Sequence, residues 1–416
     1  MEQVQYTLPD NWAWKTLDDV SEKITDGTHH SPKVQHSEWE PGRFKYITSK
    51  NIKNNGMKLD DISYIDQDIH DEIYARCPPE IEDQLLTKDG AMTGTCCLNE
   101  LNEHFSLLSS VALIKQKRSI ILPKYLNYYL QSHVGQNFLL GDISGAAITR
   151  TNIKKLKSTP VPLAPFSEQK HIVEKLDALL TRIDTAIEHL QESVDLADAL
   201  SQNGLDVYFA ELTKTTPKLP LSKLADFISG YAFKSGDFTS EFGIKPIKIT
   251  NVGVNEFSEN AEEFLPASYE SEYQRFAAKA NDIVIALTRP IINGGLKVCR
   301  VPESYSGALV NQRVAAITSQ NKHVLDFIYL YLQSSRTKNY VLEKSKSLNQ
   351  PNLSITDLKN LTLPLPANDE AITKAVADCN ALISKARKSK AEISEKITMM
   401  QQLKASILDS AFKGDL

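Results

Sequence analysis

Polar and basic residues recur at matched places in the two halves of this 416-residue sequence, next to apolar runs of strand length. Such side chains can bind DNA, because Arg and Lys read guanine edges, Asn and Gln read adenine edges, and Ser, Thr and Lys hold phosphates. The candidates are Lys33, Thr48, Ser49, Lys50, Asn51, Lys88, Thr93, Ser144, Arg150 and Asn152 in the first half, and Lys234, Thr250, Asn251, Thr288, Arg289, Asn293, Arg313, Lys346, Asn349, Gln350 and Asn352 in the second. Each loop alone is compatible with an ordinary turn, but the recurrence in both halves indicates a shared ligand.

The matched places belong to a duplication of the chain. The run Tyr-Leu-Gln-Ser at 129–132 returns at 331–334, and the pair Leu-Asp at 205–206 returns at 408–409. The period has the size of a domain plus a connector, which is too long for a solenoid repeat. We therefore expect a pseudo-two-fold internal repeat, with two similar units performing similar tasks.

Each half also contains a segment with the pattern of a long helix. Apolar residues recur there with alternating three- and four-residue spacing, as in the seam of a coiled coil. The seam residues are Ile172, Leu176, Leu179, Ile183, Ile187 and Leu190 in the first segment, and Ile372, Val376, Ile383, Ile397, Met400 and Ile407 in the second. The first segment is acidic and the second weakly basic, so we expect the two helices to pack on each other. Because a whole domain separates them in sequence, we expect this packing to be antiparallel. Separate packing of each helix into its own domain is the alternative.

These elements divide the chain into four parts. The predicted boundaries are 1–165 and 214–366 for two globular domains, and 166–213 and 367–416 for two long helices. Ser167 and Asn368 follow proline-rich stretches and are expected to cap the helices. The fold class is therefore α+β, with two α/β domains of similar fold separated by an antiparallel coiled coil.

Composition and motifs exclude several other classes of protein. The sequence has no GxxxxGK[ST], GxGxxG, HExxH or GxSxG motif, and His29, His30 and His36 have no cysteine near them, so we expect neither a catalytic site nor a metal site. The net charge of −5 argues weakly against nucleic acid, but basic residues cluster within 42–58 and 275–300 and can form local basic faces. Five cysteines without a CxxC pair, and the lack of a signal peptide or a membrane-spanning run, predict a cytoplasmic protein.

Several short motifs occur in order along the whole chain. They are LPDNW at 8–12, the strand exit at 46–52, LLTKDGA at 85–91, the proline-rich stretch and helix start at 160–169, and SILDSAFKGDL at 406–416. With these motifs the chain resembles the specificity subunits of type I restriction-modification enzymes.

The resemblance implies a non-catalytic subunit that reads a split, asymmetric site in double-stranded DNA with two target-recognition domains, which the long helices hold apart. It also implies two modification (methyltransferase) subunits as partners, and optional restriction subunits. No cofactor is expected in this chain. The complex would use S-adenosylmethionine for adenine N6-methylation, and ATP and Mg²⁺ when restriction subunits are bound. The alternative is an adaptor that binds proteins through its duplicated domains, with the coiled coil as a scaffold.

Overall fold

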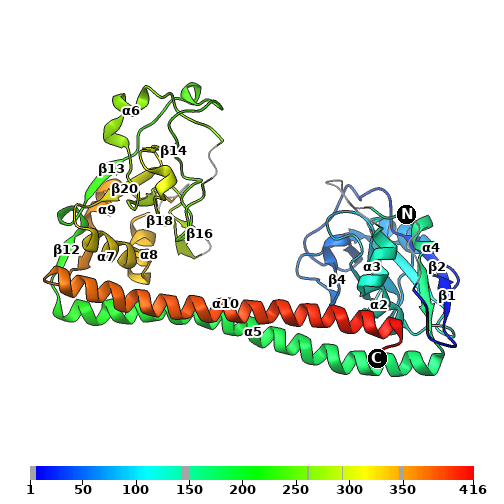
Figure 1. The fold of residues 1–416 in the computed structure, drawn as a ribbon. Coiled ribbons are helices and arrows are strands. Elements are labelled where there is room, and N and C mark those ends of the chain that lie inside the picture. Colours follow the sequence, from blue (N-terminus) through cyan, green and yellow to red (C-terminus); the bar gives the residue numbers. More distant parts are fainter. Residues whose placement is uncertain (1–5, 142–149, 260–261, 293, 346–350) are drawn as a thin grey trace. The chain divides into compact units, whose positions relative to one another are not determined.

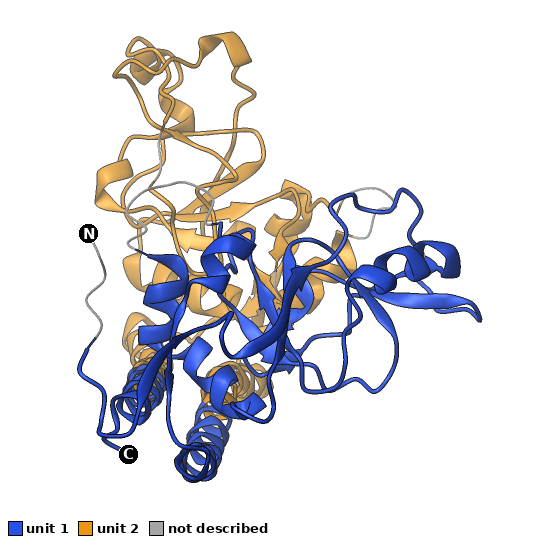
Figure 2. Ribbon diagram, turned by 90° about the vertical axis from the view of Figure 1, so that its right-hand side faces the viewer, with its two compact units in different colours: residues 1–190, 395–416 blue, residues 191–394 orange. Residues whose placement is uncertain are grey.

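The computed structural model describes residues 6–141, 150–259, 262–292, 294–345 and 351–416. The chain divides into two compact units (Figure 2). Unit 1 comprises residues 1–190 and 395–416, and unit 2 comprises residues 191–394. Each unit thus contains one globular part together with portions of both long helices. The four domain boundaries given above stay a prediction.

Unit 1 is built on a four-stranded antiparallel sheet in the order β2–β10–β7–β8. Its strands are β2 (Ser21–Asp26), β10 (Val111–Gln116), β7 (Gln84–Thr87) and β8 (Cys96–Leu98). A smaller three-stranded sheet has the order β6 (Ser63–Asp66), β3 (Arg43–Ile47), β9 (Phe105–Leu107). Two further sheets have two strands each. In one, β1 (Ala13–Thr16) pairs with β11 (Pro160–Leu163), and in the other, β4 (Ile52–Lys53) pairs with β5 (Gly56–Met57). The helices of the globular part are α1 (Gln67–Arg76), α2 (Pro123–Gln131), α3 (His133–Leu140) and α4 (Ile153–Lys157).

Unit 2 repeats this plan. Its four-stranded sheet is β13 (Asp226–Ser229), β20 (Val314–Thr318), β15 (Ile283–Ala286), β18 (Val298–Arg300), and its ribbon joins β12 (Lys218–Pro220) to β21 (Thr362–Pro364). The parallel pair β14 (Pro246–Ile247) and β19 (Leu309–Val310) matches β3 and β9 of unit 1, and β16 (Ile291–Ile292) pairs with β17 (Gly295–Leu296). The helices are α6 (Tyr269–Glu272), α7 (Lys322–Leu332), α8 (Ser335–Lys344) and α9 (Ile355–Asn360). The same strand order in both units confirms the predicted repeat of fold.

The two long helices are α5 (Phe166–Thr215) and α10 (Asp369–Lys413), drawn in green and in orange to red in Figure 1. Asn368 caps α10 as predicted, since its side chain accepts a hydrogen bond from the Ala371 N–H at 2.9 Å. The predicted cap Ser167 is wrong, because α5 begins one residue earlier, at Phe166. A residue inside the first turn cannot act as the N-cap.

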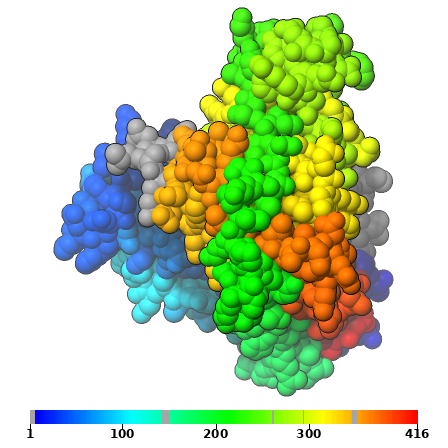
Figure 3. Space-filling view, turned by 90° about the vertical axis from the view of Figure 1, so that its left-hand side faces the viewer, coloured from blue at the N-terminus to red at the C-terminus, as the bar shows by residue number. Residues whose placement is uncertain are grey.

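The helices run antiparallel, as predicted. In unit 2 Lys390 contacts Asp198 at 2.6 Å, and in unit 1 Lys404 contacts Asp184 at 2.6 Å. Moving 14 residues forward along α10 moves the partner 14 residues backward along α5, which is the signature of antiparallel pairing in steps of two heptads. Within unit 2, Figure 3 shows the start of α10 (orange) beside the end of α5 (green).

Both globular cores include the end of one long helix and the start of the other. In unit 1, Ile172 and Leu176 of α5 are buried together with Phe412 of α10. In unit 2, Phe209 of α5 is buried together with Ile372 of α10. The aromatic contacts repeat with the chain: the ring of Phe412 lies 5.3 Å from Tyr129 at 72°, and that of Phe209 lies 5.0 Å from Tyr331 at 83°. Each helix is thereby anchored in the core of a globular domain.

Because the helix ends pack into the domain cores, the buried residues differ from the predicted coiled-coil seam at one position. Leu179 is exposed, and Leu180 is buried in its place, because α5 presents the i, i+4, i+8 row Ile172, Leu176, Leu180 to the core of unit 1. The prediction for Leu179 is therefore wrong. Ile183 is buried, and the remaining predicted seam residues are half-buried: Ile187, Leu190, Val376, Ile383, Ile397, Met400 and Ile407.

Candidate nucleic-acid interface

Unit 2 has an open hollow with a basic lining at the exits of β14 and β15. Four of the predicted residues meet there, namely Thr250, Thr288, Arg289 and Arg313, together with Ile249, Ile291, Ile292 and Lys297. Among the described residues, the lining contains three cationic side chains and no carboxylate. A concentration of basic and hydroxyl groups on a protein of negative net charge is the electrostatic pattern of a phosphate- or base-binding surface.

The backbone around this hollow is held by contacts between segments that are distant in sequence. The N–H of Leu287 donates to the carbonyl of Arg313 at 2.9 Å, and the N–H of Arg289 donates to the carbonyl of Pro351 at 2.8 Å. Thr288 and Asn352 form an isolated antiparallel bridge. Arg289 has a φ of 46°, a left-handed conformation that is uncommon outside glycine and often marks functional loops.

Lys297 was not among the predicted residues. Its Nζ donates to the Ile249 carbonyl at 2.9 Å and so joins the β14 exit to the segment between β17 and β18. Desolvation lowers the pKa of its ammonium group. The only sequence signal was its position in the basic cluster at 275–300, where nothing distinguished it from other surface lysines.

Unit 1 has loops at the same topological positions, but their charges are neutralised by partners. Lys50 pairs with Asp61 at 2.8 Å, and Arg150 pairs with Asp89 at 2.7 Å. Thr48 and Ser49 are half-buried beside them, and the Ser49 N–H donates to the Ser110 hydroxyl at 3.3 Å. The two units therefore share a framework and differ in the chemistry of their loops.

Two of the predicted DNA-binding residues are buried and cannot contact DNA. Asn51 and Asn251 are 2 % and 4 % exposed. Each amide group donates to a carbonyl seven residues ahead, Lys58 at 3.0 Å and Ser258 at 2.7 Å, and each side-chain oxygen accepts from a backbone N–H three residues back. These asparagines repeat because they build the same turn, so neither can present its side chain to a ligand.

Lys88 and Thr93 are also buried, so neither side chain can contact DNA as predicted. The Lys88 ammonium is enclosed beside Asp26 at 3.2 Å, and the Thr93 hydroxyl donates to the Gly90 carbonyl at 2.7 Å.

The remaining candidates lie elsewhere. Asn152 caps α4, because its side chain accepts a hydrogen bond from the Lys155 N–H at 2.9 Å. Lys33 and Lys234 are exposed but do not line the hollow. Five further candidates lie outside the described residues: Ser144, Asn293, Lys346, Asn349 and Gln350.

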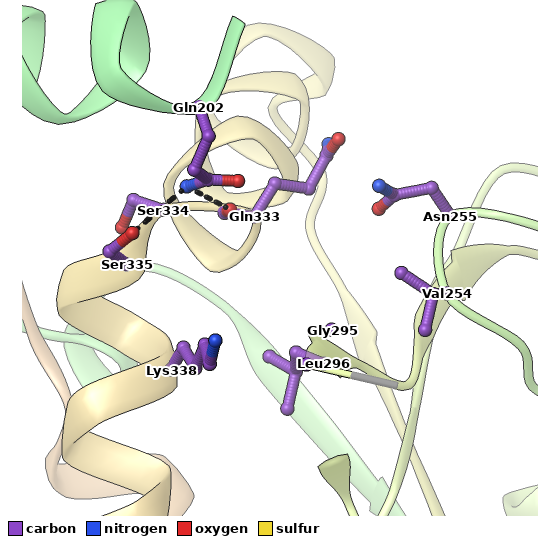
Figure 4. Close-up of a pocket in the computed structure, with 10 residues that line it drawn as sticks. Gln202, Val254, Asn255, Gly295, Leu296, Gln333, Ser334, Ser335 and Lys338 are labelled. Atoms are coloured by element: carbon purple, nitrogen blue, oxygen red, sulfur yellow. Dashed lines mark hydrogen bonds between the residues drawn. The ribbon is translucent and has the colours of Figure 1, made fainter. Parts of the chain in front are cut away.

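Unit 2 also has a smaller cavity beside the start of α8 (Figure 4). The amide of Gln202, on α5, donates to the Gln333 carbonyl at 3.1 Å and to the Ser335 hydroxyl at 3.3 Å. Lys338 of α8 lines the cavity opposite Gly295. At the position of Lys338, unit 1 has Gln136, whose amide donates to the Gly94 carbonyl at 2.9 Å.

The comparisons with known proteins agree with this architecture. The sequence model of the type I restriction modification DNA specificity domain matches residues 9–195 and 220–397. The chain belongs to this family. Within it, the chain is 29 % identical over 325 residues to the MjaVIII specificity subunit of Methanocaldococcus jannaschii, covering 75 % of each chain. It is 21 % identical to the EcoKI specificity subunit of Escherichia coli K12, covering 98 % of this chain and 90 % of that one.

Solved structures share the fold. A chain from a study of complex assembly and conformational transition of the type I R-M system aligns with a TM-score of 0.72 at 17 % identity, over 99 % of this chain and 100 % of the other. The HsdS subunit of Thermoanaerobacter tengcongensis aligns with a TM-score of 0.54 at 19 % identity, over the full length of both. The duplicated specificity domain and the two long helices are thus the fold of the family. No helix within the described residues is long and apolar enough to cross a membrane.

Proposed function

We propose that this chain is the DNA-recognition subunit of a type I restriction-modification complex. Its two units bind duplex DNA, and catalysis belongs to other subunits. The observation that carries the proposal is the convergence of Arg289, Lys297 and Arg313 with two threonines in one hollow of a specificity-domain fold. Arg and Lys side chains supply the phosphate contacts that dominate DNA affinity and can also read guanine edges.

The target is proposed to be split and asymmetric. The two units share their strand order, so each presents loops of equal position, but the residues on those loops differ. Unit 1 presents the Asp89–Arg150 ion pair where unit 2 presents Thr288 and Asn352. Different side chains at matched positions read different base edges. Each unit therefore recognises its own half-site, with bases between the half-sites left unread.

Exposed apolar residues on both long helices support protein partners. Leu196, Leu200 and Val207 of α5 are 68 %, 66 % and 63 % exposed, and Met399 and Leu403 of α10 are 52 % and 47 % exposed. Leu196 and Leu200 lie 203 residues before Met399 and Leu403, the spacing of the internal repeat. Apolar residues exposed in stripes mark interaction surfaces. Two equivalent surfaces fit two copies of one partner, which we take to be the modification subunit.

The partners would bring the cofactors. S-adenosylmethionine would be bound by the modification subunits for adenine N6-methylation, and ATP and Mg²⁺ by restriction subunits when these join. The adenine must leave the base stack to be methylated, and that pocket would belong to the modification subunit.

Salt-dependent DNA binding tests the proposal. The chain is co-purified with a modification subunit from the same host, and affinity for genomic duplex fragments is measured from about 50 to 200 mM salt, over which several phosphate contacts lose roughly 10³-fold or more in affinity. Arg289→Ala with Arg313→Ala should weaken binding and flatten the salt slope by about two contacts. Lys322→Ala, an exposed lysine at the start of α7 outside the hollow, is the control.

Sequencing of methylated bases in the host, with and without the gene, identifies the target. Loss of N6-methyladenine at one split motif is the expected result. DNA binding that is weak, insensitive to salt and unchanged by the two arginine substitutions would refute the proposal and favour the adaptor.

A further inference from the structure

In unit 1 an exposed arginine is paired with a carboxylate at one of the loop positions predicted to contact DNA. Arg150 and Asp89 form an isolated antiparallel bridge, and the N–H of the next residue, Thr151, donates to the Lys88 carbonyl at 2.9 Å. The side chains pair as well, with Arg150 Nε 2.7 Å from Asp89 Oδ1. The Arg150 side chain is nevertheless 71 % exposed, whereas that of Asp89 is 27 % exposed.

A buried lysine anchors the Asp89 carboxylate from the inside. Lys88 Nζ lies 3.6 Å from Asp89 Oδ2 and 3.2 Å from Asp26 Oδ2, and the side chains of Lys88 and Asp26 are 5 % and 8 % exposed. Arg76 contacts Asp26 on its other side at 2.6 Å. Buried charges are costly unless they are paired, so this alternating row of charges fixes each member against its neighbours. The row ends at the exposed guanidinium of Arg150.

The geometry of the last ion pair leaves the outer part of the guanidinium available. Asp89 meets Arg150 at Nε, the nitrogen nearest the main chain. The terminal Nη1 and Nη2 groups carry four of the five N–H donors. They make no ion pair or hydrogen bond with the described residues. The Nε contact is a charge pair without an aligned hydrogen bond to Asp89 Oδ1. A guanidinium held beside a carboxylate in this way keeps its terminal donors for two parallel hydrogen bonds to a pair of acceptors, and among base edges in the major groove guanine offers such a pair, O6 and N7.

We propose that Arg150 reads a guanine in the half-site of unit 1, with Asp89 as its positioning residue. This inference rests on the proposed function and specifies the chemistry of one of its two half-sites. Unit 2 has the same backbone bridge, between Thr288 and Asn352, but lacks the row of charges, because Leu287 stands at the position of Lys88. The shared bridge is thus a frame that carries different side chains in the two units, and the guanine contact made from this bridge belongs to unit 1.

Selection of DNA duplexes from a randomised library by the co-purified complex tests this proposal. Arg150→Lys keeps a positive charge for phosphate but lacks the planar fork. It should lower the preference for guanine at one position by roughly 5- to 150-fold, as expected for one bidentate base contact. All other positions of the motif should stay unchanged. Arg118→Lys is the matched control, because Arg118 is also exposed in unit 1 and paired with a carboxylate, that of Glu82, at 3.1 Å.

Asp89→Asn is the second variant. It removes the charge that orients Arg150 while keeping the size of the side chain, and Lys88 retains Asp26 as its partner. The same single position should lose part of its guanine preference, with the half-site of unit 2 intact. A purely structural role of Asp89 would leave the selected bases unchanged in whatever complex still assembles.

The possible results distinguish a failure of the Arg150 inference from a failure of the proposed function. If the unaltered complex selects a split motif but both variants select that same motif, with affinity unchanged or uniformly lower, Arg150 is at most a phosphate contact and the inference is overturned. If the unaltered complex selects no sequence at all, the proposed function itself fails.

Discussion

Replacing Phe412, near the end of α10, should destabilise unit 1 and leave unit 2 intact. The Phe412 ring is fully buried and lies edge-on to two tyrosines of α2, 5.2 Å from Tyr125 and 5.3 Å from Tyr129. Truncation of a buried Phe to Ala costs about 3–5 kcal/mol, and each aromatic pair adds about 0.5–1.5 kcal/mol beyond its buried area. We expect Phe412→Ala to lie in the upper part of the 3–5 kcal/mol range, about 4–5 kcal/mol. For a body of about 200 residues, this corresponds to a fall in Tm of roughly 8–20 °C.

Hydrogen exchange followed by mass spectrometry can locate the effect. In Phe412→Ala, peptides covering α2 should lose protection, and those covering α7 should not. Phe209→Ala is the symmetric variant, because Phe209 packs on Phe327 and Tyr331 of α7 in unit 2. It should give the opposite pattern. Val207→Ala, on the exposed side of α5, is the control and should change stability by less than about 0.5 kcal/mol.

These expected patterns follow from the separate hydrophobic cores of the two units. Equal loss of protection in α2 and α7 after either phenylalanine substitution would refute this expectation, because the two units would then unfold as one body. A destabilisation below about 1 kcal/mol would show that the site collapses around the truncated side chain and that the ring is not anchored as described.

Two further predictions concern charge. Burial lowers the pKa of His70, which is 2 % exposed, so the folded state favours its neutral form. The contribution of His70 to the stability of unit 1 is therefore complete only above the unfolded pKa of about 6.5. Unit 1 should therefore lose stability as the pH falls from about 7 through the lowered pKa. In urea unfolding at about pH 7.5 and 5.5, His70→Gln should reduce this loss of stability. An equal loss in the variant would assign the pH dependence to other groups. Lys404→Asp should cost at most about 1 kcal/mol, because its ion pair with Asp184 is exposed, and adding Asp184→Lys should restore the loss if the helices are in the antiparallel register.

Local periodicity was enough to predict the long helices, because apolar spacing and capping residues are written in consecutive positions. The helix expected within 367–416 is α10 (Asp369–Lys413), and the repeat of motifs predicted two domains of similar fold, which share their strand order. The opposite charges of the two helices also indicated that they pair, and the domain between them in sequence indicated the antiparallel direction, which the Asp198–Lys390 and Asp184–Lys404 contacts show together.

Recurrence by itself was a misleading guide to the binding surface. Asn51 and Asn251 recur in both halves because both build a buried turn, and Lys88 is polar yet enclosed by carboxylates. Structural and functional repeats look alike in a sequence, because each preserves residue type and spacing. Only the burial of a side chain separates them.

The sequence by itself determined the duplication, the helices and the family resemblance, since each depends on residues close together in the chain or on order along it. Only the tertiary structure decided that Thr250, Thr288, Arg289 and Arg313 share one hollow, and that Asp89 faces Arg150. It also decided that Leu180, not Leu179, faces the core. These outcomes depend on how separate segments pack against one another, and packing is a property of long-range contacts that spacing along the chain does not encode.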